Sequence, residues 1–454
     1  MIAKAPAAVE SAPRRYALDV RAARSVGWLT LPMGLWLLDW LSINTGPWDI
    51  GAYDLTSASS ITAVRAAFPL VVFAIALLRL PGRAAQKRNW AEKGFWIYGV
   101  VMLLACSGAD AWFNHAYWGF AFLGALGAAE LVLRRSDRLA AVERLNWLSW
   151  AITVAALVVM LILARDVLMA PEADDSAYGL INRFETAHGY GIARETGLSR
   201  MAAVPAIVSL TLLLSGRGWK RWASVPVFLA SLYIMWIMQS RGALFSFVGA
   251  LFFVLLFGHK RGRGALTFSS FVALAVIFVF VVSQSELESL WQHATRGTGA
   301  EGFVTASGRY DIYAELFSKS MDSPLFGYGP QADRLFALNA QNAFVYALLC
   351  GGVVGATFFV AAMISAWRAL IALALRAWRL PERERLMFQM TGAVLVFATL
   401  RSLPENNAAL FSVDLLLQYP AMLYLVALHA VREPVRPRSG VIRFGRLYSN
   451  ANPQ

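Results

Sequence analysis

Four arginines lie at or beyond the ends of apolar segments, in positions that predict anion binding: Arg200 in GLSR, Arg241 in QSRG, Arg309 in SGRY and Arg401 in RSLPENN. Arginine is costly beside a membrane segment unless it reaches water or an anion. Its planar guanidinium can bind phosphate or carboxylate through two parallel hydrogen bonds. Converging guanidiniums could therefore hold a pyrophosphate without a metal, although any single one could instead extend to the membrane interface.

The element expected to position Arg309 is a short helix within a long loop. The segment TASGRYDIYAELFSKSMDSPLFGYGPQ predicts a helix from about Gly308 to Ser320, capped by Ser307 and ending before Ser323-Pro324. A cation in the first helical turn opposes the positive end of the helix dipole, and a bound anion would reverse that penalty.

The same helix carries an aromatic face formed by Tyr310, Tyr313 and Phe317. This face predicts a helix packed at the membrane surface or against other helices. The GYGP sequence that follows, Gly327 to Pro330, predicts a turn leading back toward Gln341-Asn342.

Several loop residues on the expected side of the arginines could transfer protons, and each could equally be an ordinary solvated side chain. They are Glu405, Asp311, His188 and His293. Cys106 and Cys350 each lie in an apolar run without a second ligand at metal spacing, so neither a disulfide framework nor a zinc site is predicted. We expect no metal and no cofactor.

Composition identifies the environment of these residues. The 454 residues are 58% hydrophobic and 15% charged, and the mean hydropathy is +0.53. One soluble core could not bury that much apolar surface, so lipid must be part of the solvent. The net charge of +13 comes from short basic clusters between apolar runs, which is typical of membrane proteins and argues against nucleic acid as a partner.

Apolar runs of about 20 residues predict an all-α, polytopic integral membrane protein with about twelve transmembrane helices. The expected spans are Ser25–Asn44, Ile61–Leu80, Gly94–Phe113, His115–Leu133, Leu145–Ala164, Leu198–Leu214, Trp219–Met238, Gly242–Phe257, Leu266–Ser283, Ala343–Ala366, Leu386–Leu403 and Ala409–His429.

Charge placement predicts the orientation of these spans. Most of the 41 Lys and Arg residues fall on one side of this topology, and most of the 28 acidic residues fall on the other. Both termini are therefore expected in the cytoplasm. The predicted organisation is a cytoplasmic tail (1–24), a transmembrane domain (25–429) with outward loops at 165–197 and 284–341, and a second cytoplasmic tail (430–454).

Three ordered segments resemble the O-antigen ligase and O-antigen polymerase superfamily: SRGALFSF from Ser240, SGRYDIYAELFSKSMDSPLFGYGP from Ser307 and QNAFVYALLCGGVVG from Gln341. The resemblance extends from about Leu198 to Leu428. It implies a GT-C-like glycosyltransferase of the bacterial inner membrane, with its active site facing the periplasm. Such enzymes act on undecaprenyl-pyrophosphate-linked glycans without a metal or a nucleotide-sugar donor.

The resemblance assigns roles to individual residues. Arg241 and Arg309 match the family's arginines and would bind pyrophosphate, with Arg200, Arg401 and Tyr310 as further candidates beside them. Ligases of the family commonly carry His-Asn where this chain has Gln341-Asn342. Glutamine cannot act as a base, although its amide could orient an acceptor. The candidate catalytic residues are therefore Gln341, Asn342 and Glu405.

The preferred reaction is inverting polymerisation of lipid-linked repeat units of an O-antigen or exopolysaccharide. The alternatives are a ligase that transfers the glycan to lipid A-core or another acceptor, a flippase for the same lipid-linked glycan, and a non-catalytic scaffold of an export complex. Expected partners are the donor lipid, the acceptor glycan and the bilayer, and polysaccharide chain-length and export proteins could join them.

Overall fold

The computed structural model describes residues 30–43, 60–80, 89–106, 112–134, 137–163, 195–238, 240–257 and 309–432. These residues form helices and connecting turns without a strand among them, which confirms the predicted all-α class for this part of the chain. The predicted ninth span, Leu266–Ser283, lies outside the described residues. So do residues 1–29, 164–194, 258–308 and 433–454. The last helix continues to Arg432, so the first three residues of the second predicted tail, 430–432, are helical.

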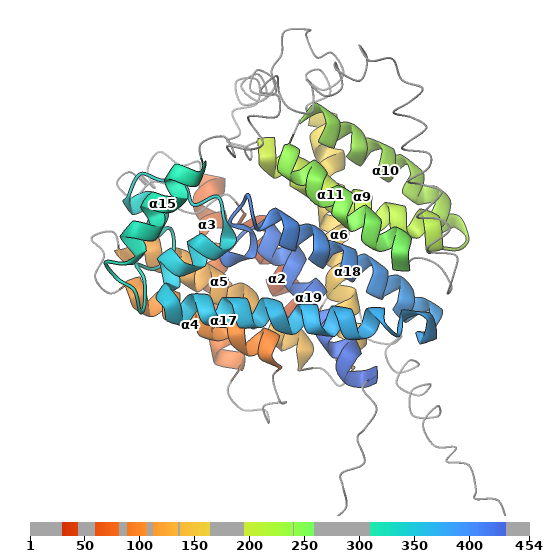
Figure 1. Cartoon of the computed structure of the whole chain (residues 1–454). Coiled ribbons are helices and arrows are strands. Elements are labelled where there is room, and N and C mark those ends of the chain that lie inside the picture. Colours follow the sequence, from red (N-terminus) through yellow and green to blue (C-terminus); the bar gives the residue numbers. More distant parts are fainter. Residues whose placement is uncertain are drawn as a thin grey trace, which may run out of the picture.

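The described helices follow the predicted spans closely (Figure 1). In chain order they are α2 (Leu31–Leu41), α3 (Ser60–Arg79), α4 (Trp90–Ala105), α5 (Trp112–Leu133), α6 (Arg138–Leu163), α9 (Glu195–Ser215), α10 (Trp219–Ile237), α11 (Arg241–Phe257), α15 (Arg309–Ser320), α16 (Ala332–Leu335), α17 (Ala343–Ala374), η3 (Ala377–Arg379), α18 (Glu382–Arg401), η4 (Asn407–Ala409) and α19 (Val413–Arg432).

Five of the described helices are long and apolar enough to cross a membrane: α5, α6, α9, α17 and α19. The chain is therefore a multi-pass membrane protein. The total of twelve spans stays a prediction. Helices α2 and α11 are shorter, with 11 and 17 residues, while α18 is long enough but begins with the charged sequence ERER.

The third predicted span differs in its boundaries. We expected Gly94–Phe113, whereas α4 begins at Trp90 and ends at Ala105. The side chain of Asn89 accepts a hydrogen bond from the backbone N–H of Glu92 at 3.0 Å and caps the helix there. Because Asn89 caps the helix, α4 begins about one turn before the predicted start at Gly94.

Charged side chains form two layers at opposite ends of α18 and α19. At one end, Glu384 in α18 pairs with Arg432 in α19. At the other end, Arg401 closes α18 and Asp414 lies in the first turn of α19. Each helix has 20 residues, so about 30 Å separates the two layers at the usual helical rise. That separation matches the hydrocarbon core of a bilayer.

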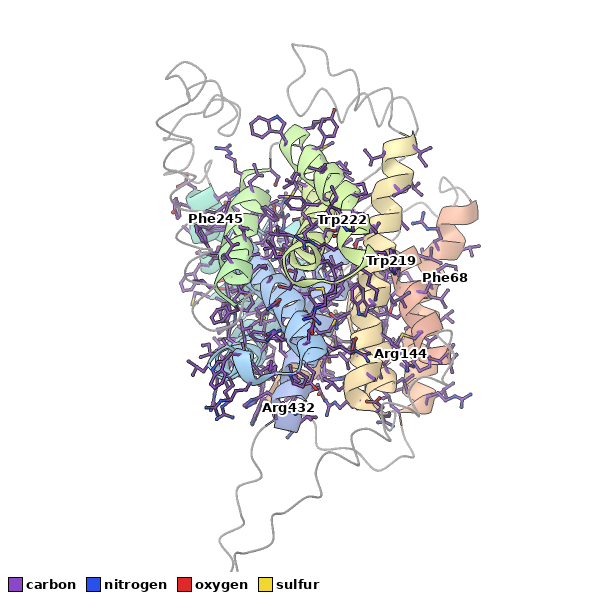
Figure 2. All side chains as sticks on the ribbon, turned by 90° about the vertical axis from the view of Figure 1, so that its right-hand side faces the viewer. Phe68, Arg144, Trp219, Trp222, Phe245 and Arg432 are labelled. Carbon is purple, nitrogen blue, oxygen red and sulfur yellow. The ribbon has the colours of Figure 1, made fainter. Side chains whose placement is uncertain are left out.

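Helices α9, α10 and α11 form a group that packs on α18 and α6 (Figure 1). Large apolar side chains project from the outer surface, including Trp219 and Trp222, which are 74% and 73% exposed, and Phe245 (Figure 2). An outer surface of this kind is expected where lipid rather than water surrounds a protein.

Helix α17 packs closely on α4 and is broken in its third turn. Gly352 has φ 58° and ψ −167°, a conformation outside the helical region. The break exposes backbone groups, which the loop after α15 satisfies. Val353 N–H donates to Pro324 O at 2.7 Å, and Tyr328 and Gly329 N–H donate to the carbonyls of Leu349 and Cys350 at 3.0 and 2.9 Å. The GYGP turn thus meets α17 two turns beyond the predicted place at Gln341-Asn342.

Candidate functional site

The candidate site surrounds the connection between α18 and α19, residues 402–412. Four other parts of the chain reach it. Ala343 N–H of α17 donates to Ser402 O at 2.9 Å, and Tyr98 Oη of α4 donates to Ala409 O at 2.9 Å. Arg309 of α15 and Gly242 of α11 approach Pro404. We call residues 402–412 the hub loop.

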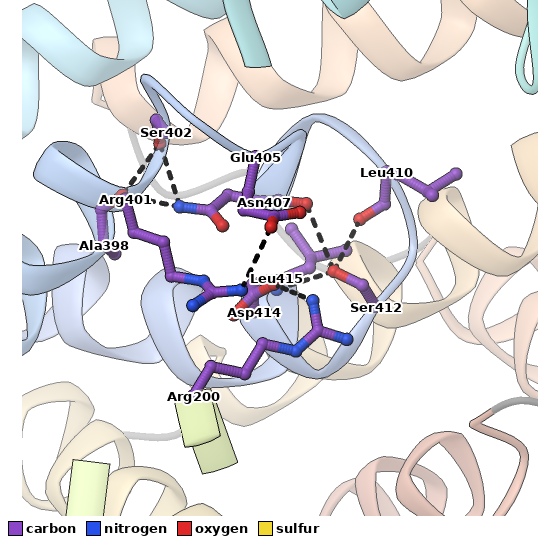
Figure 3. Close-up of polar contacts among 10 residues, drawn as sticks. All are labelled: Arg200, Ala398, Arg401, Ser402, Glu405, Asn407, Leu410, Ser412, Asp414 and Leu415. Carbon is purple, nitrogen blue, oxygen red and sulfur yellow. Dashed lines mark hydrogen bonds and ion pairs between the residues drawn. The ribbon is translucent and has the colours of Figure 1, made fainter. Parts of the chain in front are cut away.

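Internal hydrogen bonds fix the hub loop. Asn407 is buried, and its Nδ2 donates to Ala398 O at 2.6 Å and to Ser402 Oγ at 3.1 Å. Its φ of 27° lies in a region that asparagine tolerates better than most residues. Ser412 Oγ then donates to Asn407 O at 3.1 Å. The loop is therefore held as a rigid connection (Figure 3).

Two arginine–carboxylate pairs lie side by side beneath this loop (Figure 3). Arg200 Nη1 of α9 lies 2.7 Å from Asp414 Oδ2, with the two side chains 18% and 6% exposed. Arg401 Nη2 lies 3.7 Å from Glu405 Oε1, with the side chains 1% and 17% exposed. Arg401 also interacts electrostatically with Arg200, Arg309 and Asp414. Like charges that interact with one another favour a further anion among them.

The other two predicted arginines reach the same loop from different helices. Arg309 Nη1 lies 3.4 Å from Pro404 O. Arg241 begins α11, and its neighbour Gly242 packs on Pro404, because a Cβ built on that glycine would lie 3.2 Å from Pro404 Cγ. The structure thus brings Arg200, Arg309 and Arg401 to one loop and places the start of α11, which carries Arg241, beside it, although these residues are spread over about 200 residues of sequence.

The amide pair at the start of α17 is structural in this conformation. Asn342 Oδ1 accepts from Phe344 and Val345 N–H at 2.9 and 3.1 Å and so caps α17, while its Nδ2 donates to Leu403 O at 3.0 Å. Gln341 contributes its backbone carbonyl, which accepts from Tyr313 Oη at 2.6 Å. The two residues therefore join α15, α17 and the hub loop.

Tyr310 and Tyr313, which were predicted on one face of this helix, lie in different environments on α15. Tyr313 is half-buried, and burial raises the pKa of its hydroxyl, while Arg309 lowers this pKa and Glu405 raises it. Tyr313 therefore lies near both Arg309 and Glu405 of the hub loop. Tyr310 is instead 62% exposed, on the outer side of the helix. Asp311 is exposed as well, and His188, His293 and Ser307 lie outside the described residues.

The arrangement has the chemical composition that an anion site requires. Three guanidiniums, from Arg200, Arg309 and Arg401, and two carboxylates meet at the hub loop, so positive charge exceeds negative charge and an added diphosphate would be attracted. Within the ranges that the structure describes, no group of three or more His, Cys, Asp or Glu side chains could hold a metal ion. Glu405 is the partly exposed carboxylate beside the guanidiniums.

Comparison with known protein families gives a match, which covers part of the candidate site. Residues 226–360 match the O-antigen ligase family. The predicted resemblance to the O-antigen ligase and polymerase superfamily is thereby confirmed. The O-antigen ligase match includes Arg241, Arg309, Gln341 and Asn342, and it ends before the hub loop. No curated protein matches the chain.

Asp414 is the residue of this candidate site that sequence reasoning missed. It was placed within the last predicted span and treated as part of an apolar run. Its partner Arg200 is 214 residues away. An acidic residue in the first turn of a membrane helix was the available signal, because a charge there requires a partner or water.

Truncation of Asp414 is expected to destabilise the folded protein. Asp414→Ala removes the partner of a mostly buried guanidinium, which costs about 3 kcal/mol in unfolding free energy. Denaturation by SDS in mixed micelles measures this loss. The control is Glu382→Ala, which breaks the exposed pair with Arg217 at 2.9 Å and should cost about 0–1 kcal/mol. Equal, small losses in both variants would contradict the role of Asp414.

Proposed function

We propose that the chain is an inverting, metal-independent glycosyltransferase that uses a glycan linked to undecaprenyl pyrophosphate as its donor. The observation that supports this most is the convergence of Arg200, Arg309 and Arg401 on the hub loop, beside an O-antigen ligase family match. Guanidiniums held by carboxylates and carbonyls are preorganised for a diphosphate. The site would lie at the periplasmic face of the bacterial inner membrane, as charge placement predicts.

In the proposed reaction, a hydroxyl oxygen of the acceptor sugar attacks the anomeric carbon of the donor. The new glycosidic bond forms as the bond from that carbon to the phosphate oxygen breaks. The electron pair leaves with undecaprenyl pyrophosphate, whose growing negative charge the arginines stabilise. Because this charge is largest in the transition state, binding it there accelerates the reaction.

Glu405 is our candidate for receiving the proton of the acceptor hydroxyl. Its carboxylate is partly exposed and lies next to Arg401, so an acceptor approaching the bound diphosphate from outside would meet it. Gln341 and Asn342 would hold the acceptor side of the site in place through the contacts that join α15, α17 and the hub loop.

The proposed acceptor is a second lipid-linked repeat unit, which makes the enzyme a polymerase. The reason is Gln341, which stands where ligases of the family commonly have a histidine and which cannot take a proton. Transfer to lipid A-core by a ligase is the second candidate. Analysis of the lipid-linked glycans after deletion of the gene separates the alternatives: single repeat units outside support a polymerase, full-length unattached chains a ligase, and units retained inside a flippase.

The role of Glu405 gives a kinetic prediction. Glu405→Gln keeps the size of the side chain and one oxygen that can accept a hydrogen bond, but it cannot accept a proton. We therefore expect kcat to fall about 100-fold or more while KM for the donor lipid does not rise. Transfer between purified lipid-linked units in nanodiscs measures both constants. Glu315→Gln, on the exposed face of α15, is the matched control, and Gln341→Ala should have a smaller effect. A Glu405→Gln enzyme with wild-type kcat would rule out the proton-transfer role.

A further inference from the structure

Helix α15 has three faces, each with a distinct chemical character. The inward face carries Leu316 and Ser320, which are buried, together with Arg309 and Tyr313. The opposite flank is polar and exposed, with Asp311, Glu315, Ser318 and Asp322. Between these two faces runs a stripe of exposed apolar side chains.

The apolar stripe is long and strongly exposed. Tyr310, Phe317 and Met321 lie within about 40° of one another at 100° per residue, and they are 62%, 53% and 49% exposed. The turn after the helix extends the stripe with Leu325 and Phe326, which are 60% and 55% exposed. A contiguous apolar surface of this kind indicates a contact with lipid or with another protein.

The stripe is continuous with the lipid-facing side of α17. Leu325 and Phe326 lie directly against the break in that helix, because a Cβ built on Gly352 would be 2.3 Å from Leu325 C. The next residue, Val353, is 49% exposed, and Ile364 and Ile371 continue the exposed row at 54% and 53%. Helix α17 is long and apolar enough to cross a membrane. The apolar surface therefore passes from a membrane span onto α15.

We propose that α15 and the turn at Leu325-Phe326 lie in the outer leaflet of the bilayer, with the apolar stripe in the acyl-chain boundary. An amphipathic helix in an interface has its apolar side in lipid and its charged side in water. Here the acidic flank faces the aqueous side, and the inward face packs against α17 and the hub loop. Figure 1 shows α15 at the edge of the molecule, where lipid can reach it. The proposal requires that α17 spans the bilayer, and it does not require glycan transfer.

Spin labels on single introduced cysteines test this placement. Phe317→Cys and Leu325→Cys place a label on the stripe, and Met321→Cys provides a third position on it if either of them fails to fold. Glu315→Cys and Ser318→Cys on the polar flank are the matched controls. Wild-type protein gives the background, since Cys106 and Cys350 are both 0% exposed. Each variant is reconstituted in nanodiscs and exposed to oxygen, which concentrates in lipid, and to a water-soluble nickel chelate.

We expect the stripe positions to collide with oxygen several-fold more often, relative to nickel, than the control positions do. Equal ratios at stripe and control positions would overturn the proposal, because α15 would then stand in water. Low collision with both reagents along the stripe would also overturn it, because another protein segment would then cover this surface.

Discussion

The Arg309→Ala and Arg241→Ala variants are expected to lose glycan transfer by about 100-fold or more in kcat, because each removes a donor aimed at the charge that develops on the pyrophosphate. Arg309 reaches the hub loop from the first turn of α15, and Arg241 begins α11 beside it. The measurement is the single-turnover rate with a purified lipid-linked donor in nanodiscs. Arg309→Lys should recover only part of the rate, since lysine keeps the charge but not the planar fork.

Substitution of an arginine outside the site distinguishes loss of pyrophosphate binding from a general effect of removing a positive charge. Arg217 pairs with Glu382, and its side chain is 82% exposed, so Arg217→Ala should transfer glycan at the wild-type rate. All three alanine variants should be inserted and elute as the wild-type protein does. Wild-type polymer in cells that express the Arg309 and Arg241 variants would exclude the proposed mechanism.

The second large effect is expected at Gly352. The φ of 58° with ψ of −167° is a conformation that essentially only glycine adopts, and a Cβ there would lie 2.3 Å from the backbone carbonyl of Leu325. Gly352→Ala should therefore cost about 3 kcal/mol or more and release the 324–329 loop from α17. SDS denaturation in mixed micelles measures the loss of stability, and proteolysis within the 324–329 loop measures the release.

Gly34→Ala is the control for this substitution. A Cβ at Gly34 in α2 would have no atom within 4 Å, and alanine favours a helix more than glycine does. That variant should be at least as stable as the wild type. If Gly352→Ala were equally stable, α17 would not be broken at this residue.

Hydropathy predicted most of the helices, and the chemistry of arginine predicted most of the candidate site. Apolar runs located most of the described helices because a membrane leaves the backbone few alternatives. The four arginines could be singled out because each is costly in its local position. Their meeting at one loop was a reasonable hypothesis, since the topology placed all four at the same membrane face. Its chemistry remains a proposal.

The rest depended on contacts between distant parts of the chain. The Arg200–Asp414 pair joins residues 214 positions apart, and no local pattern connects them. The GYGP turn was predictable from its glycines and proline, but the place where it binds depends on the broken helix at Gly352. Tyr310 and Tyr313 share a sequence pattern, and only the packing of α15 separates an exposed ring from one that binds Gln341.

The hub loop is bound through its backbone. Its neighbours donate to the carbonyls of Ser402, Leu403, Pro404 and Ala409, and every residue type carries a carbonyl. The side chains at several loop positions could therefore change in evolution while the geometry of the site persisted. The donors, which include Tyr98, Arg309 and Asn342, have no such freedom. A search for distant relatives should weigh these donors more heavily than the loop that they hold.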